Sequence, residues 1–229
     1  MKYPISALNA FFKRNKQSKG IISVWGDFGV GKTTFVLQTV INSVYLRNKI
    51  LFIYTKPNFP IEKINKIFGV YDDTHENLTF IQPINYDDLH KIVYNLEFLI
   101  LSRINDQHTQ YSLIVIDSVT DLYRLELNNR KKEKNYELNY ILNQILANLF
   151  FIHNKYNIEI LIVNEKASKQ EENQIIEIQS GGNVIEYWVS TDIKIERTEI
   201  LNQRKFTVSN RPEIFNKEFF SELTETGFH

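Results

Sequence analysis

Short apolar runs alternate along this chain with segments in which apolar residues recur every three or four positions. The apolar runs are typical of buried strands, and they lie at residues 21–25, 50–54, 78–81, 113–116 and 158–163. The helical spacing is found at residues 5–16, 34–46, 61–68, 87–99 and 136–156. Because strands that alternate with helices form parallel sheets, the pattern predicts an α/β fold with a mostly parallel central sheet and helices on both faces.

The pattern changes to a period of two after residue 189. Ile193 and Ile195 alternate with charged residues, and Phe206 and Val208 alternate again beyond a turn expected near Asn202. These strands are predicted to extend the sheet in antiparallel orientation.

Other segments carry weaker patterns. Residues 166–179 are polar and lack a clear period, so they are predicted to form a loop. Phe215, Phe219 and Phe220 are expected to close the core, with packing on a partner as the alternative. Residues 1–229 show no repeat or linker and are interpreted as one domain, with a short N-terminal helix in residues 1–19 and a strand region at about 189–229.

The composition restricts the class of protein. The 229 residues are enough for a sizeable core. Lys+Arg and Asp+Glu both total 27, so any nucleic-acid contact must come from a local patch. There is no cysteine, and no apolar run is long enough to span a bilayer. We therefore expect a cytoplasmic protein without membrane contact.

A phosphate-binding loop follows the first predicted strand and precedes a predicted helix. It fits G-x-x-x-x-G-K-[ST] with Gly26, Asp27, Phe28, Gly29, Val30, Gly31, Lys32 and Thr33, and Thr34 follows. Glycines let successive N–H groups face phosphate oxygens. Lys32 is expected to reach the β- and γ-phosphates and Thr33 to ligate Mg²⁺. A chance glycine loop is the alternative.

Asp117 is the expected partner of this loop. It follows the apolar run at 113–116, and an acidic residue at such a strand end holds Mg²⁺ in P-loop NTPases. The alternative is that it caps the helix after Ser118. ATP is favoured over GTP because the chain has no Asn-Lys-x-Asp motif for reading guanine.

Several segments together resemble the RecA/RadA recombinase superfamily, and within it the archaeal RadA paralogues of the RadB type. The segments are the loop at 26–34, the stretches at 113–126 and 162–165, the Gly-Gly-Asn region at 180–185, and residues 211–213. The resemblance implies a RecA-like ATPase core. No Phe-x-x-Ala polymerisation motif precedes the core, and the N-terminal segment is too short for a helix–hairpin–helix domain. Both points favour an accessory paralogue.

The resemblance also implies two DNA-facing loops, at 128–134 and 166–179. Their cations are possible phosphate contacts, namely Arg130, Lys131, Lys132, Lys134, Lys166 and Lys169. A solvated charge run is the alternative for the first loop, and neither loop has an aromatic residue placed for base stacking.

Two residues depart from the family pattern. Lys56 stands where the family has the glutamate that activates water, and Glu165 stands where it has a glutamine that senses the γ-phosphate. A protonated lysine, with a pKa of about 10.4, cannot act as a base. We hypothesise that Lys56 and Glu165 form an ion pair, so that Lys56→Glu alone is worse than the double change with Glu165→Gln. The alternative is that Lys56 faces solvent.

The phosphate loop and the resemblance together imply an ATP-binding accessory protein of homologous recombination and DNA repair, with slow or partner-stimulated hydrolysis. Its expected partners are single-stranded DNA, a RadA-type recombinase or other paralogues, or further copies of itself. The alternatives are a KaiC-like signalling ATPase without a DNA role and a pseudo-ATPase scaffold. A salt-dependent affinity for DNA would distinguish the recombination role from the first alternative, the signalling ATPase.

Overall fold

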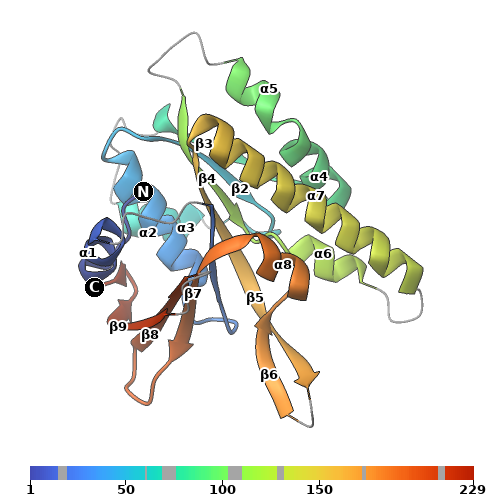
Figure 1. Ribbon diagram of the computed structural model, residues 1–229. Helices are drawn as coiled ribbons and strands as arrows, with labels where there is room; N and C mark the ends of the chain where they lie inside the picture. Colours follow the sequence, from blue (N-terminus) through green and yellow to red (C-terminus); the bar gives the residue numbers. More distant parts are fainter. Residues whose placement is uncertain are drawn as a thin grey trace.

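The computed structural model of the protein describes residues 1–14, 20–59, 61–68, 76–102, 110–127, 132–171, 174–210 and 215–229. Its strands are β1 (Ile21–Gly26), β2 (Lys49–Tyr54), β3 (Leu78–Ile81), β4 (Tyr111–Asp117), β5 (Glu159–Glu171), β6 (Gln174–Gln179), β7 (Val189–Arg197), β8 (Gln203–Asn210), β9 (Phe215–Thr224) and β10 (Gly227–Phe228). Within the described residues they form one sheet in the order β10-β9-β8-β7-β1-β5-β4-β2-β3, with β6 paired to β5 (Figure 1).

The sheet has the predicted orientation. Strands β7, β1, β5, β4, β2 and β3 run parallel to their neighbours, and β8, β9 and β10 continue the sheet antiparallel. The turn between β7 and β8 contains Asn202 at a φ of 65°, near the predicted position. Continuous apolar strands are stable here because both faces of the parallel sheet are covered.

Helices cover the two faces. On one face lie α1 (Ser6–Arg14), α2 (Lys32–Val44) and α3 (Ile61–Phe68), and on the other lie α4 (Tyr86–Tyr94), α5 (Leu96–Leu101), α6 (Asp121–Glu126), α7 (Lys132–Tyr156) and α8 (Gly182–Trp188) (Figure 1). Alternate residues of β2 enter separate cores, since Leu51 packs on the side of α4 and α7 whereas Phe52 packs on the side of α2. The prediction of helices on both faces is confirmed.

The predicted loop at 166–179 is wrong. Residues Lys166 to Glu171 continue β5 and pair antiparallel with β6 to form a hairpin, which extends beyond the rest of the sheet (Figure 1). Ile175 is exposed, and much of the hairpin's other surface is polar. Polar and apolar residues alternate along a strand when one of its faces is buried. Neither face of this hairpin is completely buried, so the period-two pattern is absent from its sequence.

The helix predicted at 87–99 is two helices. Asn85 caps α4 by accepting a hydrogen bond from the backbone N–H of Asp88 at 2.9 Å, so the helix begins before Asp87. Asn95 ends α4 and precedes α5. Both helices pack on the same core, so the spacing of apolar residues continues across the boundary between them. That spacing alone therefore cannot show where α4 ends and α5 begins.

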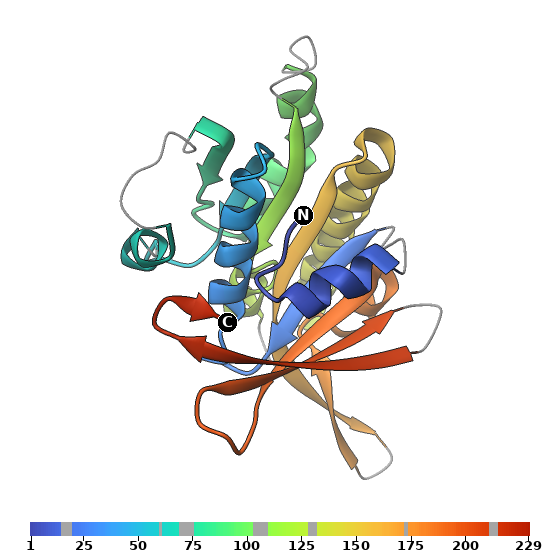
Figure 2. The same cartoon turned by 90° about the vertical axis from the view of Figure 1, so that its left-hand side faces the viewer.

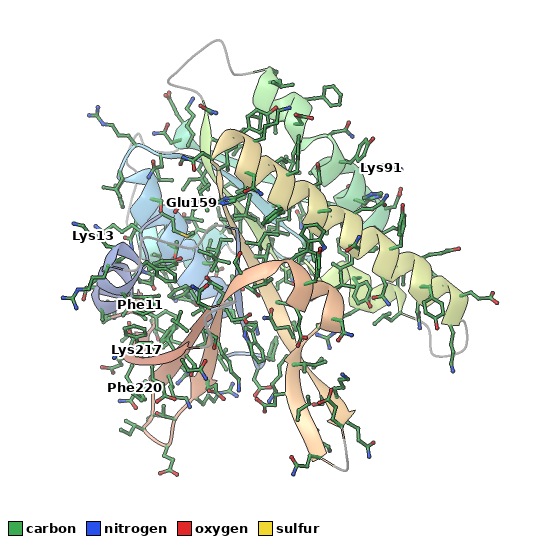
Figure 3. All side chains as sticks on the ribbon, viewed as in Figure 1. Phe11, Lys13, Lys91, Glu159, Lys217 and Phe220 are labelled. Atoms are coloured by element: carbon green, nitrogen blue, oxygen red, sulfur yellow. The ribbon has the colours of Figure 1, made fainter. Side chains whose placement is uncertain are left out.

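The C-terminal phenylalanines have different environments. In Figure 2 α1 lies against the C-terminal strands, where the ring centroids of Phe11 and Phe219 are 5.6 Å apart. Phe219 packs on the core as predicted. Phe220 remains 54% exposed, labelled in Figure 3, so the expectation of core closure is wrong for this residue. The side chain of Phe215 lies outside the described part.

No helix in the described parts of the chain has both the length and the apolar character needed to cross a membrane.

Candidate functional site

The predicted phosphate loop joins the end of β1 to the start of α2. Gly26, Gly29 and Gly31 have φ angles of 148°, 74° and 106°, and Gly31 is the N-cap of α2. A Cβ atom at Gly31 would lie 2.8 Å from the ring of Phe228, so the turn requires glycine for space as well as for φ. A tight glycine turn that opens a helix is an arrangement that binds anions through backbone N–H groups.

A cavity of about 210 Å³ lies against this turn. It is lined by Phe28, Gly29, Gly31, Lys32, Thr33, Thr34, Lys56, Glu165 and Leu223. The first turn of α2 contains no acidic residue, so the positive end of its dipole is not offset from within the helix. The cavity therefore brings loop residues together with both residues that depart from the family pattern.

Lys32 is held by the loop and by the end of β5. Its Nζ atom donates to the carbonyl oxygens of Gly26 at 2.9 Å and Asp27 at 2.7 Å, and it lies 2.9 Å from a carboxylate oxygen of Glu165. The two side chains of this ion pair are 5% and 12% exposed. A phosphate placed in the cavity therefore competes with Glu165 for Lys32.

Asp117 ends β4, fully buried, and the strand ends beside it are fixed by hydrogen bonds. The N–H of Thr55 donates to the carbonyl of Asp117 at 2.8 Å, and the N–H of Ser118 donates to the hydroxyl of Thr55 at 2.7 Å. The hydroxyl of Ser118 accepts from the N–H of Asp121 at 3.0 Å at the start of α6. The capping role considered for Asp117 thus belongs to Ser118.

Lys56 connects the loop to Asp117. Its Nζ atom donates to the hydroxyl of Thr33 at 3.1 Å and lies 3.0 Å from a carboxylate oxygen of Asp117. Burial lowers the pKa of Lys56, but the negative charge of Asp117, helped by Asp121 and Glu165, outweighs burial and holds the pKa above its ordinary value. Lys56 is therefore a protonated counter-ion, and the alternative that it faces solvent is wrong.

The hypothesised ion pair between Lys56 and Glu165 is wrong. Lys56 pairs with Asp117, and Glu165 pairs with Lys32. The order of the strands explains these pairings. Strand β2, which precedes Lys56, borders β4, which ends at Asp117. Strand β5, which carries Glu165, borders β1 and the phosphate loop. Two lysines and two carboxylates share the site, and their charges cancel.

A polar network links the end of β5 to the base of the hairpin. The side-chain amide of Asn164 donates to the carbonyl of Ser180 at 2.8 Å, and its oxygen accepts from the N–H of Glu165 at 2.8 Å. The hydroxyl of Ser23 on β1 donates to Gln179 at 2.6 Å. Asn164, Ser23, Gln179 and Ser180 are buried. The backbone of Glu165 is thus linked through hydrogen bonds of Asn164 to the base of the hairpin.

Lysines of the hairpin have acidic partners. Lys166 lies 2.7 Å from a carboxylate oxygen of Asp27 in the phosphate loop and 2.9 Å from one of Glu177. Hydrogen bonds from Lys166 and then Lys194 hold the pKa of the Glu177 carboxyl at about 2. Lys169 lies 2.5 Å from Glu171. These ion pairs reduce the positive charge at the surface of the hairpin.

Two of the other predicted DNA-facing cations, Lys132 and Lys134, lie at the start of α7. Lys132 is exposed, and Lys134 lies 3.5 Å from a carboxylate oxygen of Glu126. Arg130 and Lys131 lie outside the described residues. DNA contact by all these side chains stays a prediction.

Two arginines that sequence reasoning missed hold the phosphate loop from the C-terminal strands. Arg197 at the end of β7 donates to the carbonyl of Phe28 at 3.0 Å, and Arg204 on β8 donates to the carbonyl of Val30 at 3.2 Å. Separations of 169 and 174 residues leave no local sequence signal for these contacts. The strands added antiparallel to the sheet therefore support the site.

Comparisons with known proteins cover nearly the whole chain. The profile of the Rad51 family matches residues 6–229. A protein named DNA repair and recombination protein RadB from Methanocaldococcus jannaschii is 30% identical over 78% of this chain and 79% of its own length. Proteins of the same name from Methanococcus maripaludis strain C7 and Methanobrevibacter smithii are 29% and 24% identical, over 88% and 91% of this chain and 86% and 87% of their own lengths.

Proposed function

The chain belongs to the Rad51 family, and from this premise we propose that it is an ATP-binding accessory protein of homologous recombination and DNA repair. The similarity to proteins named for DNA repair and recombination supports this role over a KaiC-like signalling function. Within it, ATP acts as a conformational ligand, since a ligand shifts a protein toward the state that binds it better.

Membership of the Rad51 family implies ATP binding. The observation in this chain that supports it most is the glycine turn that lines the cavity. Lys32 donates hydrogen bonds to the triphosphate after releasing Glu165. Arg197 and Arg204 keep the loop in shape by holding its carbonyl groups.

Hydrolysis is slow in this proposal. Activation of water needs a base. The residue expected to supply that base follows Thr55 after β2, and it is Lys56, a protonated lysine. The nearby carboxylates of Asp117 and Glu165 are both in ion pairs with lysines. The site is therefore suited to binding and sensing ATP more than to turning it over.

The hairpin is the proposed output of the site. A phosphate that takes Lys32 from Glu165 leaves that carboxylate to move, and Asn164 transmits the movement through Ser180 and Gln179 to the base of the hairpin. Lys166 is affected too, because it joins Asp27 of the loop to Glu177 of β6. ATP binding thereby changes the surface offered to single-stranded DNA or to a recombinase.

ATP is expected to increase the affinity for single-stranded DNA by about tenfold, a coupling within the range known for linked sites. The measurement is fluorescence anisotropy of a labelled oligonucleotide at several salt concentrations, with and without ATP. Affinity should fall as salt rises, because phosphate contacts release counter-ions.

Lys32→Met is the matched control for this experiment. It removes the ligand of the triphosphate and leaves the hairpin lysines in place, so it should bind DNA equally with and without ATP. DNA binding that is absent in all conditions, with ATP still bound, would favour the signalling alternative.

A further inference from the structure

The ammonium group of Lys56 lies between the two residues expected to organise Mg²⁺. It is 3.1 Å from the hydroxyl oxygen of Thr33 and 3.0 Å from a carboxylate oxygen of Asp117. No described residue gives either oxygen of that fully buried carboxylate a well-directed hydrogen bond. Lys56 is therefore the charge that permits Asp117 to be buried here.

The arrangement does not fit a magnesium ion between Thr33 and Asp117. Mg²⁺ requires close to octahedral geometry, with oxygen ligands at about 2.0–2.1 Å, and it keeps several of its waters. A cationic nitrogen within hydrogen-bond distance of both prospective ligands occupies that space and repels a second cation. Either Lys56 leaves or the metal is excluded.

The backbone around Lys56 is held in place. The side-chain amide of Gln82 donates to the carbonyl of Lys56 at 2.8 Å and to that of Pro57 at 3.3 Å. On the other side, the hydroxyl of Thr55 accepts from the N–H of Ser118 at 2.7 Å and donates to its carbonyl at 2.9 Å. The ammonium group is thus presented from a fixed point, and its side chain is only 27% exposed.

The ammonium group can replace part of what a metal does for a bound triphosphate. Lysine has three N–H donors, and the hydroxyl of Thr33 accepts one of them. A further donor is available to an oxygen of a phosphate in the cavity, which Lys56 itself lines. Together with Lys32 it supplies two positive charges to the cavity.

We propose that Lys56 takes the place of Mg²⁺, so that this site binds ATP as the metal-free triphosphate. The proposal rests on the proposed function as an ATP-binding protein and specifies the form of its ligand. It concerns binding alone and involves no chemical step.

The test is ATP affinity by isothermal titration calorimetry in excess EDTA and in excess Mg²⁺, for the wild type and for Lys56→Met. The wild type should bind ATP with affinities in the two media that differ by less than about threefold. Lys56→Met should bind at least about tenfold more weakly in EDTA, the equivalent of one charge-assisted hydrogen bond. Mg²⁺ should restore its affinity, because removal of the ammonium opens the position between Thr33 and Asp117.

Lys91→Met is the matched control. This lysine is exposed on α4, at the outer edge of the helical layer (Figure 3), and it should leave the ratio of the two affinities unchanged. Circular dichroism and thermal unfolding of each variant check that the fold is retained.

Wild-type binding that requires Mg²⁺ to the same degree as Lys56→Met would overturn the proposal and leave ATP binding intact. Absence of ATP binding in both media would overturn the proposed function as well. Binding of Mn²⁺ without nucleotide, followed by electron paramagnetic resonance, gives a second readout, and it should be detected for Lys56→Met and not for the wild type.

Discussion

Lys32→Met is expected to weaken ATP binding by about a hundredfold or more, since it removes a positive charge and several charge-assisted hydrogen bonds to the triphosphate. Methionine retains the length of the apolar stem, so the loss reports the ammonium group. The measurement is calorimetric titration with ATP.

The same substitution should also destabilise the free protein. Lys32 neutralises Glu165, whose side chain is only 12% exposed, and its removal leaves that carboxylate without a counter-ion. We expect a loss of about 1–3 kcal/mol in the free energy of unfolding, below the cost of a completely buried charge because Glu165 borders the cavity.

The double variant Lys32→Met/Glu165→Gln separates the two effects. It should recover most of the stability, because the unpaired charge is gone, but only a small part of the ATP affinity, because the ammonium group of Lys32 is still missing. Strong ATP binding by either variant would show that Lys32 does not contact the triphosphate.

Phe35→Ala is expected to lower the free energy of unfolding by about 3–5 kcal/mol, the cost of removing a buried aromatic side chain and leaving a cavity. Phe35 lies in α2 and is fully buried. Its ring centroid is 5.8 Å from that of Tyr3, 5.5 Å from that of Phe206 and 6.0 Å from that of Phe228. It thus joins the N-terminal segment to the C-terminal strands.

Phe98→Ala is the control for size and chemistry. Phe98 also lies in a helix, α5, but is 69% exposed, so its loss should change the free energy of unfolding by less than about 0.5 kcal/mol. Urea denaturation followed by circular dichroism measures both variants. Equal effects would mean that the packing around Phe35 contributes nothing to stability.

Much of the fold is predictable from the sequence because the parallel strands are buried on both faces. Their apolar runs, such as that ending at Asp117, stand out against the helical periodicity between them. The hairpin of β5 and β6 is not predictable in this way. Its exposed surface removes the alternation that marks a strand, and only the pairing of Lys166 with Gln179 and the following pairs reveals it.

The site is partly predictable for a similar reason. The phosphate loop is a local pattern with its own chemistry, and Asp117 follows from its place at the end of a strand. The partners of Lys56 depend on which strands are neighbours, and the sequence does not give that order. Arg197 and Arg204 act across more than a hundred residues and carry no motif.

The central claim is that this site binds ATP but lacks the base needed to hydrolyse it. The most direct test measures both ATP binding and ATP hydrolysis for the wild type and for Lys56→Glu/Glu165→Gln. The wild type should bind ATP and hydrolyse it no more than about tenfold faster than Lys32→Met. In the presence of Mg²⁺ the double variant should hydrolyse it at least about tenfold faster than the wild type, because it places a carboxylate where a base can act and Mg²⁺ can replace the Lys56 ammonium group beside Asp117. Lys56→Glu alone should bind ATP more weakly than the double variant, since it retains Glu165, which competes with the triphosphate for Lys32. Rapid wild-type hydrolysis that is lost on Lys56→Glu would contradict this account.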